Sequence, residues 1–128
     1  MTDDGATTIE RARDTLRQMA ELVGDQGHTE NSRRWDRLVD QWLTDRRELA
    51  SSPEGRAAVA ELMADPHPVV RLWSSAAVLF WDPEAARPVL TAIREFPAEY
   101  DLHSITAKHT LLAFDAGTFG PDDRLPGT

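Results

Sequence analysis

Apolar residues recur at steps of three and four along the first half of the chain, the spacing that places side chains on one face of an α-helix. One apolar stripe covers residues 8–23 and a second covers residues 33–50, with a glycine-rich polar stretch between them. On the second stretch, Asp36, Asp40 and Asp45 fall opposite the apolar stripe and are expected to face away from the core. The pattern predicts two amphipathic helices joined by a loop.

Two later helices have clear start signals. Residues 52–54 read serine, proline, glutamate, and residues 82–84 repeat the signal with aspartate in place of serine. Each signal supplies a capping side chain, a proline for the first helical position and an acid for the first turn. Pro88 lies inside the second of these helices, which predicts either a bend or a helix that effectively begins later.

Residues 68–81 lie between these two helices and have almost no polar face. A helix that is apolar nearly all round is buried on several sides. This segment is therefore expected to be the central helix of the fold. A sixth helix is predicted near the end of the chain, with Ile105, His109 and Leu112 pointing inward and Gly117 closing it.

The turn and helix start at residues 62–71 resemble those of a HEAT-type repeat. In such repeats a short proline-containing turn is followed by a valine–arginine pair, here Val70 and Arg71, and then by small residues, here residues 74–77. The resemblance implies that Arg71 is structural and ties neighbouring turns through an acid, for which Asp65 is the candidate. It also implies a binding scaffold, as in small stand-alone bacterial adaptors and toxin-neutralising immunity proteins.

The predicted fold is all-α, with about six helices in antiparallel hairpins stacked as a short HEAT-like α-solenoid. Residues 1–117 are expected to form one helical domain, of which residues 52–117 carry the HEAT-like likeness. Residues 118–128 contain two prolines and two glycines, so we expect an unstructured or loosely packed, flexible tail.

The formal net charge of −8 comes from acids spread along the chain, without a basic run of more than two residues. Nucleic-acid binders present a basic stripe to phosphate, so the charge argues against nucleic acid and favours a basic protein partner. The chain has no cysteine, no basic-apolar leader and no apolar run of membrane-spanning length. These features predict a cytoplasmic protein without a membrane partner, and they leave the oligomeric state open.

No catalytic constellation stands out in the sequence. His103 and His109 are six positions apart, which places them on different helical faces instead of the three or four positions that pair metal ligands. Ser74 and Ser75 lie within a predicted helix, unlike a nucleophile on a strained elbow. The aspartates of the second helix lack the loop of oxygens that calcium needs. We therefore expect no enzyme activity, no cofactor and no metal site.

Four tryptophans in 128 residues exceed what a small core needs, so at least one is a candidate interface anchor. The predicted function is a protein-binding module with an acidic groove and an aromatic contact patch. Its candidate contact residues are Asp36, Asp40, Trp73, Trp81, Tyr100 and His103. The alternative is a small-molecule binder or enzyme with a pocket between helices near His109 and Trp73.

Overall fold

The computed structural model describes residues 3–22, 29–95 and 102–126, which fold into six α-helices without a strand. The helices are α1 (Asp3–Leu22), α2 (Thr29–Leu49), α3 (Pro53–Leu62), α4 (Pro68–Val78), α5 (Pro83–Glu95) and α7 (Leu102–Asp115). The all-α prediction is confirmed. None of the helices in these ranges combines the length and the apolarity that crossing a membrane requires.

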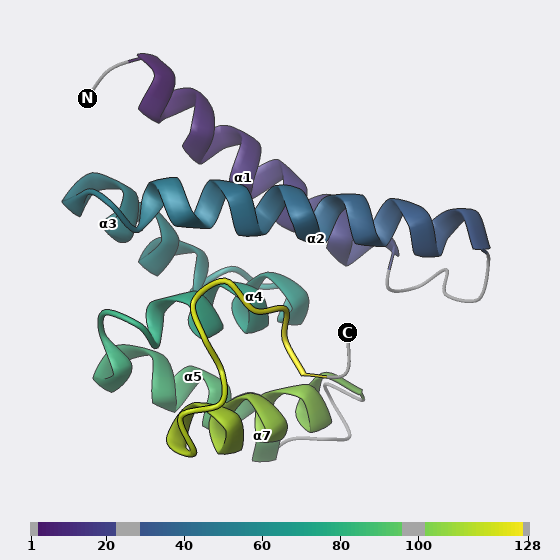
Figure 1. Cartoon of the computed structure of the whole chain (residues 1–128), viewed down its shortest axis with the longest axis vertical. Helices are drawn as coiled ribbons and strands as arrows, with labels where there is room; N and C mark the ends of the chain where they lie inside the picture. The colour runs from purple at the N-terminus through teal and green to yellow at the C-terminus, as the bar shows by residue number, and fades with distance from the viewer. Residues whose placement is uncertain (1–2, 23–28, 96–101, 127–128) are drawn as a thin grey trace.

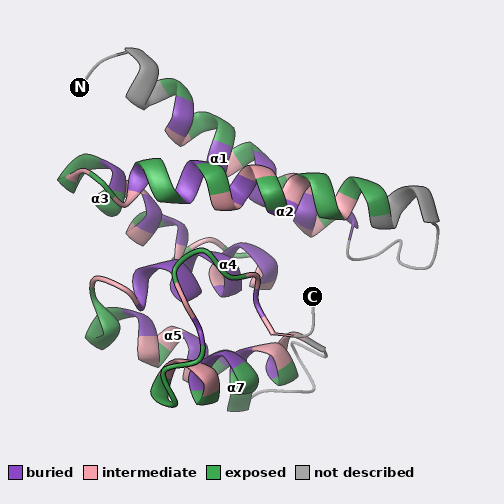
Figure 2. Cartoon of the chain, in the orientation of Figure 1, coloured by how far each residue is buried: buried purple, intermediate pink, exposed green. Residues whose placement is uncertain are grey.

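Helices α1 and α2 form a hairpin on one side of the molecule, and α4, α5 and α7 lie together on the other, with the short α3 leading from one group to the other (Figure 1). Helix α4 contacts α1, α3, α5 and α7. Every residue of α4 except Pro68 and Arg71 is buried (Figure 2). The prediction of a central helix wrapped by its neighbours is confirmed.

The N-terminal ends of α3 and α4 are set by side chains that accept hydrogen bonds from free backbone N–H groups. The Ser52 hydroxyl accepts a hydrogen bond from the Gly55 N–H at 3.0 Å, as the start signal predicts. His67 caps α4, because its Nδ1 accepts a hydrogen bond from the Val69 N–H at 3.1 Å. Gly55 also lets α3 approach the end of α2, since a Cβ there would lie 2.1 Å from the Leu49 carbonyl oxygen.

Helix α5 begins at Pro83 and runs through Pro88 to Glu95, so the expected later start is wrong. Pro88 is exposed. A proline in a helix lacks the N–H that would bond to the carbonyl four residues earlier. On this exposed side the freed carbonyl can bond to water, which explains why the helix tolerates Pro88.

Asp45 does not face away from the core, as the sequence pattern predicts, but is fully buried between α1 and α2. Arg11 donates to its carboxylate from Nη2 at 2.6 Å and from Nε at 3.1 Å. Gln41 donates a third hydrogen bond at 3.1 Å. The Asp45 charge is tolerated because α1 supplies a cation and α2 supplies a further donor.

Helix α7 buries a different face from the predicted one. Ile105 and Leu112 are 52% and 56% exposed, and His109 is exposed as well. The buried face consists of small or hydroxyl-bearing residues and one leucine, namely Ser104, Ala107, Thr110 and Leu111. Small side chains let α7 approach α5 closely, and the Thr110 hydroxyl is satisfied by the Thr106 carbonyl at 2.7 Å. The prediction from apolar spacing alone therefore chose the wrong face of α7 as the buried one.

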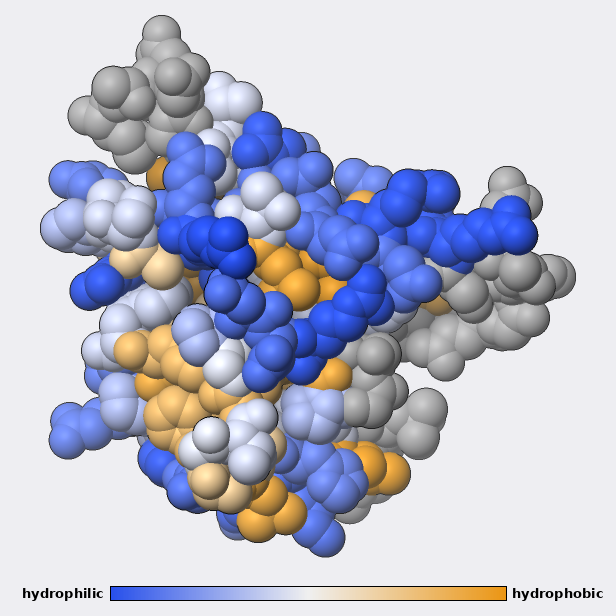
Figure 3. Space-filling view, viewed as in Figure 1, coloured by the Kyte–Doolittle hydropathy of each residue, from blue (hydrophilic) through white to orange (hydrophobic). Residues whose placement is uncertain are grey.

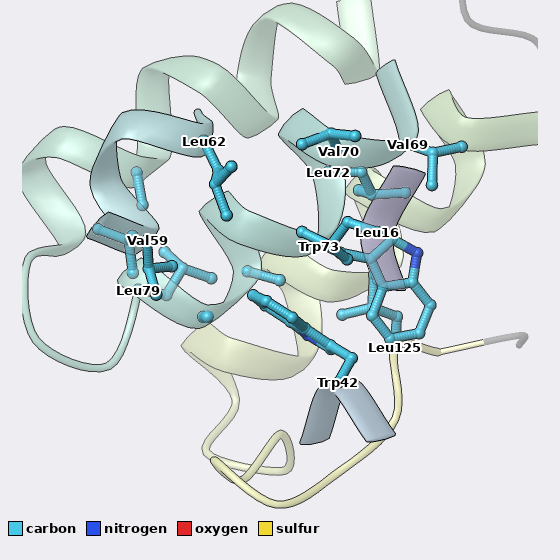
Figure 4. Close-up of a cluster of buried hydrophobic side chains, with 14 of the residues drawn as sticks. Leu16, Trp42, Val59, Leu62, Val69, Val70, Leu72, Trp73, Leu79 and Leu125 are labelled. Atoms are coloured by element: carbon cyan, nitrogen blue, oxygen red, sulfur yellow. The ribbon is translucent and has the colours of Figure 1, made fainter. Parts of the chain in front are cut away.

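The segment after α7 is packed, which corrects the expectation of a loose tail for residues 118–126. Gly117, at a φ of 75°, closes the helix as predicted, and the Thr118 N–H bonds back to the Ala113 carbonyl at 2.9 Å. Phe119 and Leu125 are only 6% and 3% exposed. Both belong to the main core, where Leu125 is drawn with Leu16, Trp42 and Trp73 (Figure 4).

Candidate binding site

A half-open pocket of about 270 Å³ lies where the ends of α2 and α4 meet the C-terminal segment. Its lining residues are Arg46, Arg47, Ala50, Ala77, Phe80, Trp81, Pro121 and Asp122. Figure 3 shows hydrophilic side chains over α2 and apolar ones gathered below it, over α4, α5 and the start of the C-terminal segment. The pocket therefore combines segments that lie far apart in the sequence.

Arg46 is the distinctive residue of this pocket, because it is only 5% exposed. Its guanidinium lies 5.9 Å from the centre of the Phe80 ring. Burial lowers the pKa of Arg46, and the negative charge of Asp122 opposes that effect. No oxygen of a described residue accepts a hydrogen bond from the Arg46 guanidinium. Arginine stays charged in proteins and can only donate, so its N–H groups still need an acceptor. The side chain of Arg46 is thus largely buried, while its guanidinium nitrogens, which solvent reaches, lie in the pocket lining without a protein acceptor.

The rim of the pocket carries further arginines that are already engaged. Arg47 pairs with Asp122 at 2.9 Å, and both side chains are well exposed. Arg56 donates from Nε to the Ala50 carbonyl at 2.7 Å and lies 5.8 Å from the centre of the Trp81 ring. With two arginines and one aspartate among its lining residues, the pocket is locally positive in a chain of net charge −8.

An aromatic cluster fixes the wall that Phe80 forms. Phe80 packs edge-on against Phe114 of α7 at 5.7 Å and in a tilted geometry against Phe119 of the C-terminal segment at 5.3 Å, measured between ring centres. Arg87 covers Phe114 and forms an ion pair with Asp115, which lowers the pKa of that carboxyl group. The end of α4 is therefore held from two sides, and the pocket wall is set before any ligand binds.

Asp36 and Asp40, which were predicted to line an acidic groove on α2, share one arginine as their partner. Arg124 donates to Asp36 from Nη1 and to Asp40 from Nη2, each at 2.9 Å. These bonds raise the pKa of Arg124 and offset the repulsion between two carboxylates one helical turn apart. Asp36 and Asp40 anchor the C-terminal segment while their side chains stay 60% and 70% exposed, so their assignment as contact residues remains a prediction.

Of the two candidate anchor tryptophans, only Trp81 is available. Trp73 is 2% exposed and packs edge-on against Trp35 with ring centres 6.0 Å apart, so it is a core residue. Trp81 is partly buried and lines the pocket. His103 is partly buried near the start of α7, away from the residues that line the pocket, and Tyr100 lies outside the described residues.

The implied pairing of Asp65 with Arg71 is also absent, since no ion pair joins these two described side chains. Asp65 instead accepts a hydrogen bond from the His67 N–H at 2.9 Å and shapes the turn before α4. The placement of the two residues does not support the alternative pocket near His109 and Trp73, because His109 is exposed on α7 whereas Trp73 is in the core.

A second hollow of about 390 Å³ lies between α1 and the turn before α4, and it is shallower. Its charged or titratable lining residues are Arg17, Glu21, Asp65 and His67, and the last two already serve the turn. Nowhere in the described part of the chain do three histidine, aspartate or glutamate side chains come together as a possible metal site. The Arg46 pocket is therefore the stronger candidate.

Sequence reasoning missed Arg46, although a signal for it was present. Arg46 follows Val39 and Trp42 at steps of seven and four, so it lies on the apolar stripe of α2. A charged residue on a core-facing stripe is either paired or functional.

Comparison of the chain with protein-family models, with curated proteins and with solved structures gives no match.

Proposed function

We propose that this chain is a binding domain without catalytic activity, and that its ligand binds in the Arg46 pocket. The observation that carries the proposal is the largely buried Arg46 side chain, whose guanidinium has no hydrogen-bond acceptor in the protein. Burying a charge without a partner destabilises a folded protein. A ligand that supplies the missing acceptor would offset that cost, so the folded protein would be more stable with the pocket occupied than with it empty.

The chemistry of the lining supports binding over catalysis. The eight lining residues include no histidine, serine, threonine, lysine or glutamate. General acid–base catalysis needs a group that titrates near the working pH, and covalent catalysis needs an activated nucleophile. Arginine, exposed aspartate and aromatic rings provide recognition instead.

Filling the pocket tests this proposal. Ala50 lines the pocket, so we expect Ala50→Phe to occupy it and to abolish ligand binding there. The measurement is a screen of small fragments of mixed charge, followed by amide and indole N–H shifts in two-dimensional NMR. In the unsubstituted protein, binding fragments should shift the Trp81 indole N–H and the amides of the lining residues.

Ala92→Phe is the matched control, because Ala92 is exposed on α5 and does not line the pocket. This variant should retain every fragment that the unsubstituted protein binds, provided both variants melt cooperatively. Fragments that shift residues elsewhere, or that bind Ala50→Phe equally well, would refute the pocket as the binding site.

A second candidate function, a protein-binding module, is favoured by the outer face of α7. Ile105 and Leu112 are the two large apolar side chains that are exposed among the described residues, and their spacing of seven places them on one face. Apolar side chains at helical spacing are typical of helix-mediated contacts. With a net charge of −8, a basic partner would be attracted at long range, as by an immunity-type protein that neutralises a basic toxin.

For this second candidate, we expect the double substitution Ile105→Ser, Leu112→Ser to abolish capture of a basic partner by the immobilised protein. Capture should also weaken as salt is raised from about 0.05 to 0.5 M, because screening shortens the reach of the charges. Ala116→Ser, at an exposed position just beyond α7, serves as the control. Partners that survive the double substitution would argue against this surface.

A further inference from the structure

We infer that the Arg46 pocket recognises a small organic monocarboxylate with a flat aromatic body. This inference rests on the proposed function and specifies the ligand class for the same site. It combines three observations: one arginine of the lining without an acceptor in the protein, walls made of aromatic and apolar side chains, and a carboxylate already present at the rim.

The guanidinium of Arg46 sets the charge and the geometry of the ligand group. Arginine presents a planar fork of N–H donors that matches the two oxygens of a carboxylate. The Arg46 side chain is largely buried and its guanidinium lies at the pocket, so an anion that displaces water from the pocket would interact with it more strongly than at an open surface. An amine would meet the like charge of Arg46 and is excluded.

The walls set the shape of the rest of the ligand. Phe80 and Trp81 offer ring faces or edges, and Ala50, Ala77 and Pro121 add small apolar surfaces. Flat aromatic ligands pack against such rings in offset or edge-on geometry. At about 270 Å³ the pocket lies just below the range of drug-sized sites, which start at about 300 Å³, so it suits a single ring.

The rim limits the ligand to one negative charge. Arg47 is the second cation of the lining, but it is paired with Asp122 at 2.9 Å. A phosphate or a dicarboxylate would bring a second charge towards Asp122 without a free cation to receive it. The apolar walls add a desolvation cost that increases with the charge of the ligand. A monocarboxylate therefore fits better than a dianion.

Benzoate is the probe for this inference, with benzylamine, benzyl alcohol and inorganic phosphate as comparison ligands at the same ionic strength. Binding is followed by isothermal titration and by the shift of the Trp81 indole N–H. We expect benzoate to bind at least tenfold more tightly than any of the other three. We also expect benzoate, but not benzylamine, to raise the melting temperature.

Three variants assign the preference to Arg46. Arg46→Met should weaken benzoate binding at least tenfold, and Arg46→Lys should weaken it less, because lysine keeps the charge but lacks the fork. Arg37→Met should change affinity less than threefold, since Arg37 is an exposed arginine of α2 that does not line the pocket. Without ligand, Arg46→Met should melt no lower than the unsubstituted protein, because methionine keeps the apolar stem and the guanidinium has no protein hydrogen bond to lose.

The outcomes separate the ligand class from the proposed function. If benzyl alcohol or benzylamine binds in the pocket as tightly as benzoate, the carboxylate assignment is overturned while the pocket remains a binding site. If phosphate binds more tightly than benzoate, the restriction to a single charge is overturned. If no member of the fragment screen shifts the lining residues, the proposed function itself fails. A melting temperature that falls sharply in Arg46→Met would show that Arg46 has a structural role, and would overturn the inference.

Discussion

Replacing Ala76 by aspartate is expected to prevent the protein from folding. Ala76 is 2% exposed in the last turn of α4, the helix that contacts four others. An aspartate there would bury a carboxylate among apolar side chains. Such burial without a partner costs at least about 4–5 kcal/mol, which is comparable with the whole stability of a small domain, about 5–15 kcal/mol.

Far-UV circular dichroism and thermal melting measure this effect directly. Ala57→Asp introduces the same charge at an exposed position of α3 and is expected to change the free energy of unfolding by about 0.5 kcal/mol or less. A helical Ala76→Asp variant with a cooperative melt near that of the unsubstituted protein would contradict the central position of α4.

Ending the chain after Gly117 is expected to lower the free energy of unfolding by about 3–5 kcal/mol. The truncation removes Phe119 and Leu125, both buried, and each large apolar side chain contributes roughly 1.5–3 kcal/mol on burial. It also removes Arg124, which holds Asp36 and Asp40. These ion pairs lie near the surface, so their share is expected to be at most about 1 kcal/mol.

Urea denaturation of the truncated chain checks this value, and full-length Arg124→Met separates the contribution of the ion pairs from that of the buried side chains. The truncated chain should also fail to bind any fragment in the Arg46 pocket, because Pro121 and Asp122 form part of its lining. An unchanged urea midpoint would mean that residues 118–128 contribute little to stability, as the sequence had suggested.

The parts of the fold that could be predicted depend on local chemistry. Ser52 and Pro53 start α3, and Gly117 ends α7, because capping and left-handed backbone geometry are properties of a few neighbouring residues. The burial of α4 was also predictable, since residues 68–81 offer no polar face to direct towards water.

The parts that could not be predicted depend on partners distant in the sequence. Asp45 looks solvent-facing until Arg11 of α1 is placed beside it, 34 positions earlier. The buried face of α7 is chosen by how closely α5 approaches, which apolar spacing does not report. The C-terminal segment resembles a tail in composition, yet Leu125 reaches a core built from the helices before it.

The candidate site was hidden for the same reason. Its walls come from residues 46–50, 77–81 and 121–122, which only the folded chain brings together. Trp81 was among the predicted contact residues, whereas Arg46, on the apolar stripe of α2, was overlooked. The net charge of −8 gave no sign of this locally positive pocket, because a net charge does not say where along the fold the charged side chains lie.

The C-terminal segment, residues 118–126, forms one wall of the pocket. It is also a strap held against α2 by ion pairs, because Arg124 pairs with Asp36 and Asp40, and Asp122 pairs with Arg47. Occupancy of the pocket and attachment of the strap are therefore thermodynamically linked, and the linkage is reciprocal. Whatever loosens the strap, such as high salt acting on its exposed ion pairs, lowers the affinity for ligand. A bound ligand, in turn, shields the strap from proteases that need an unfastened chain.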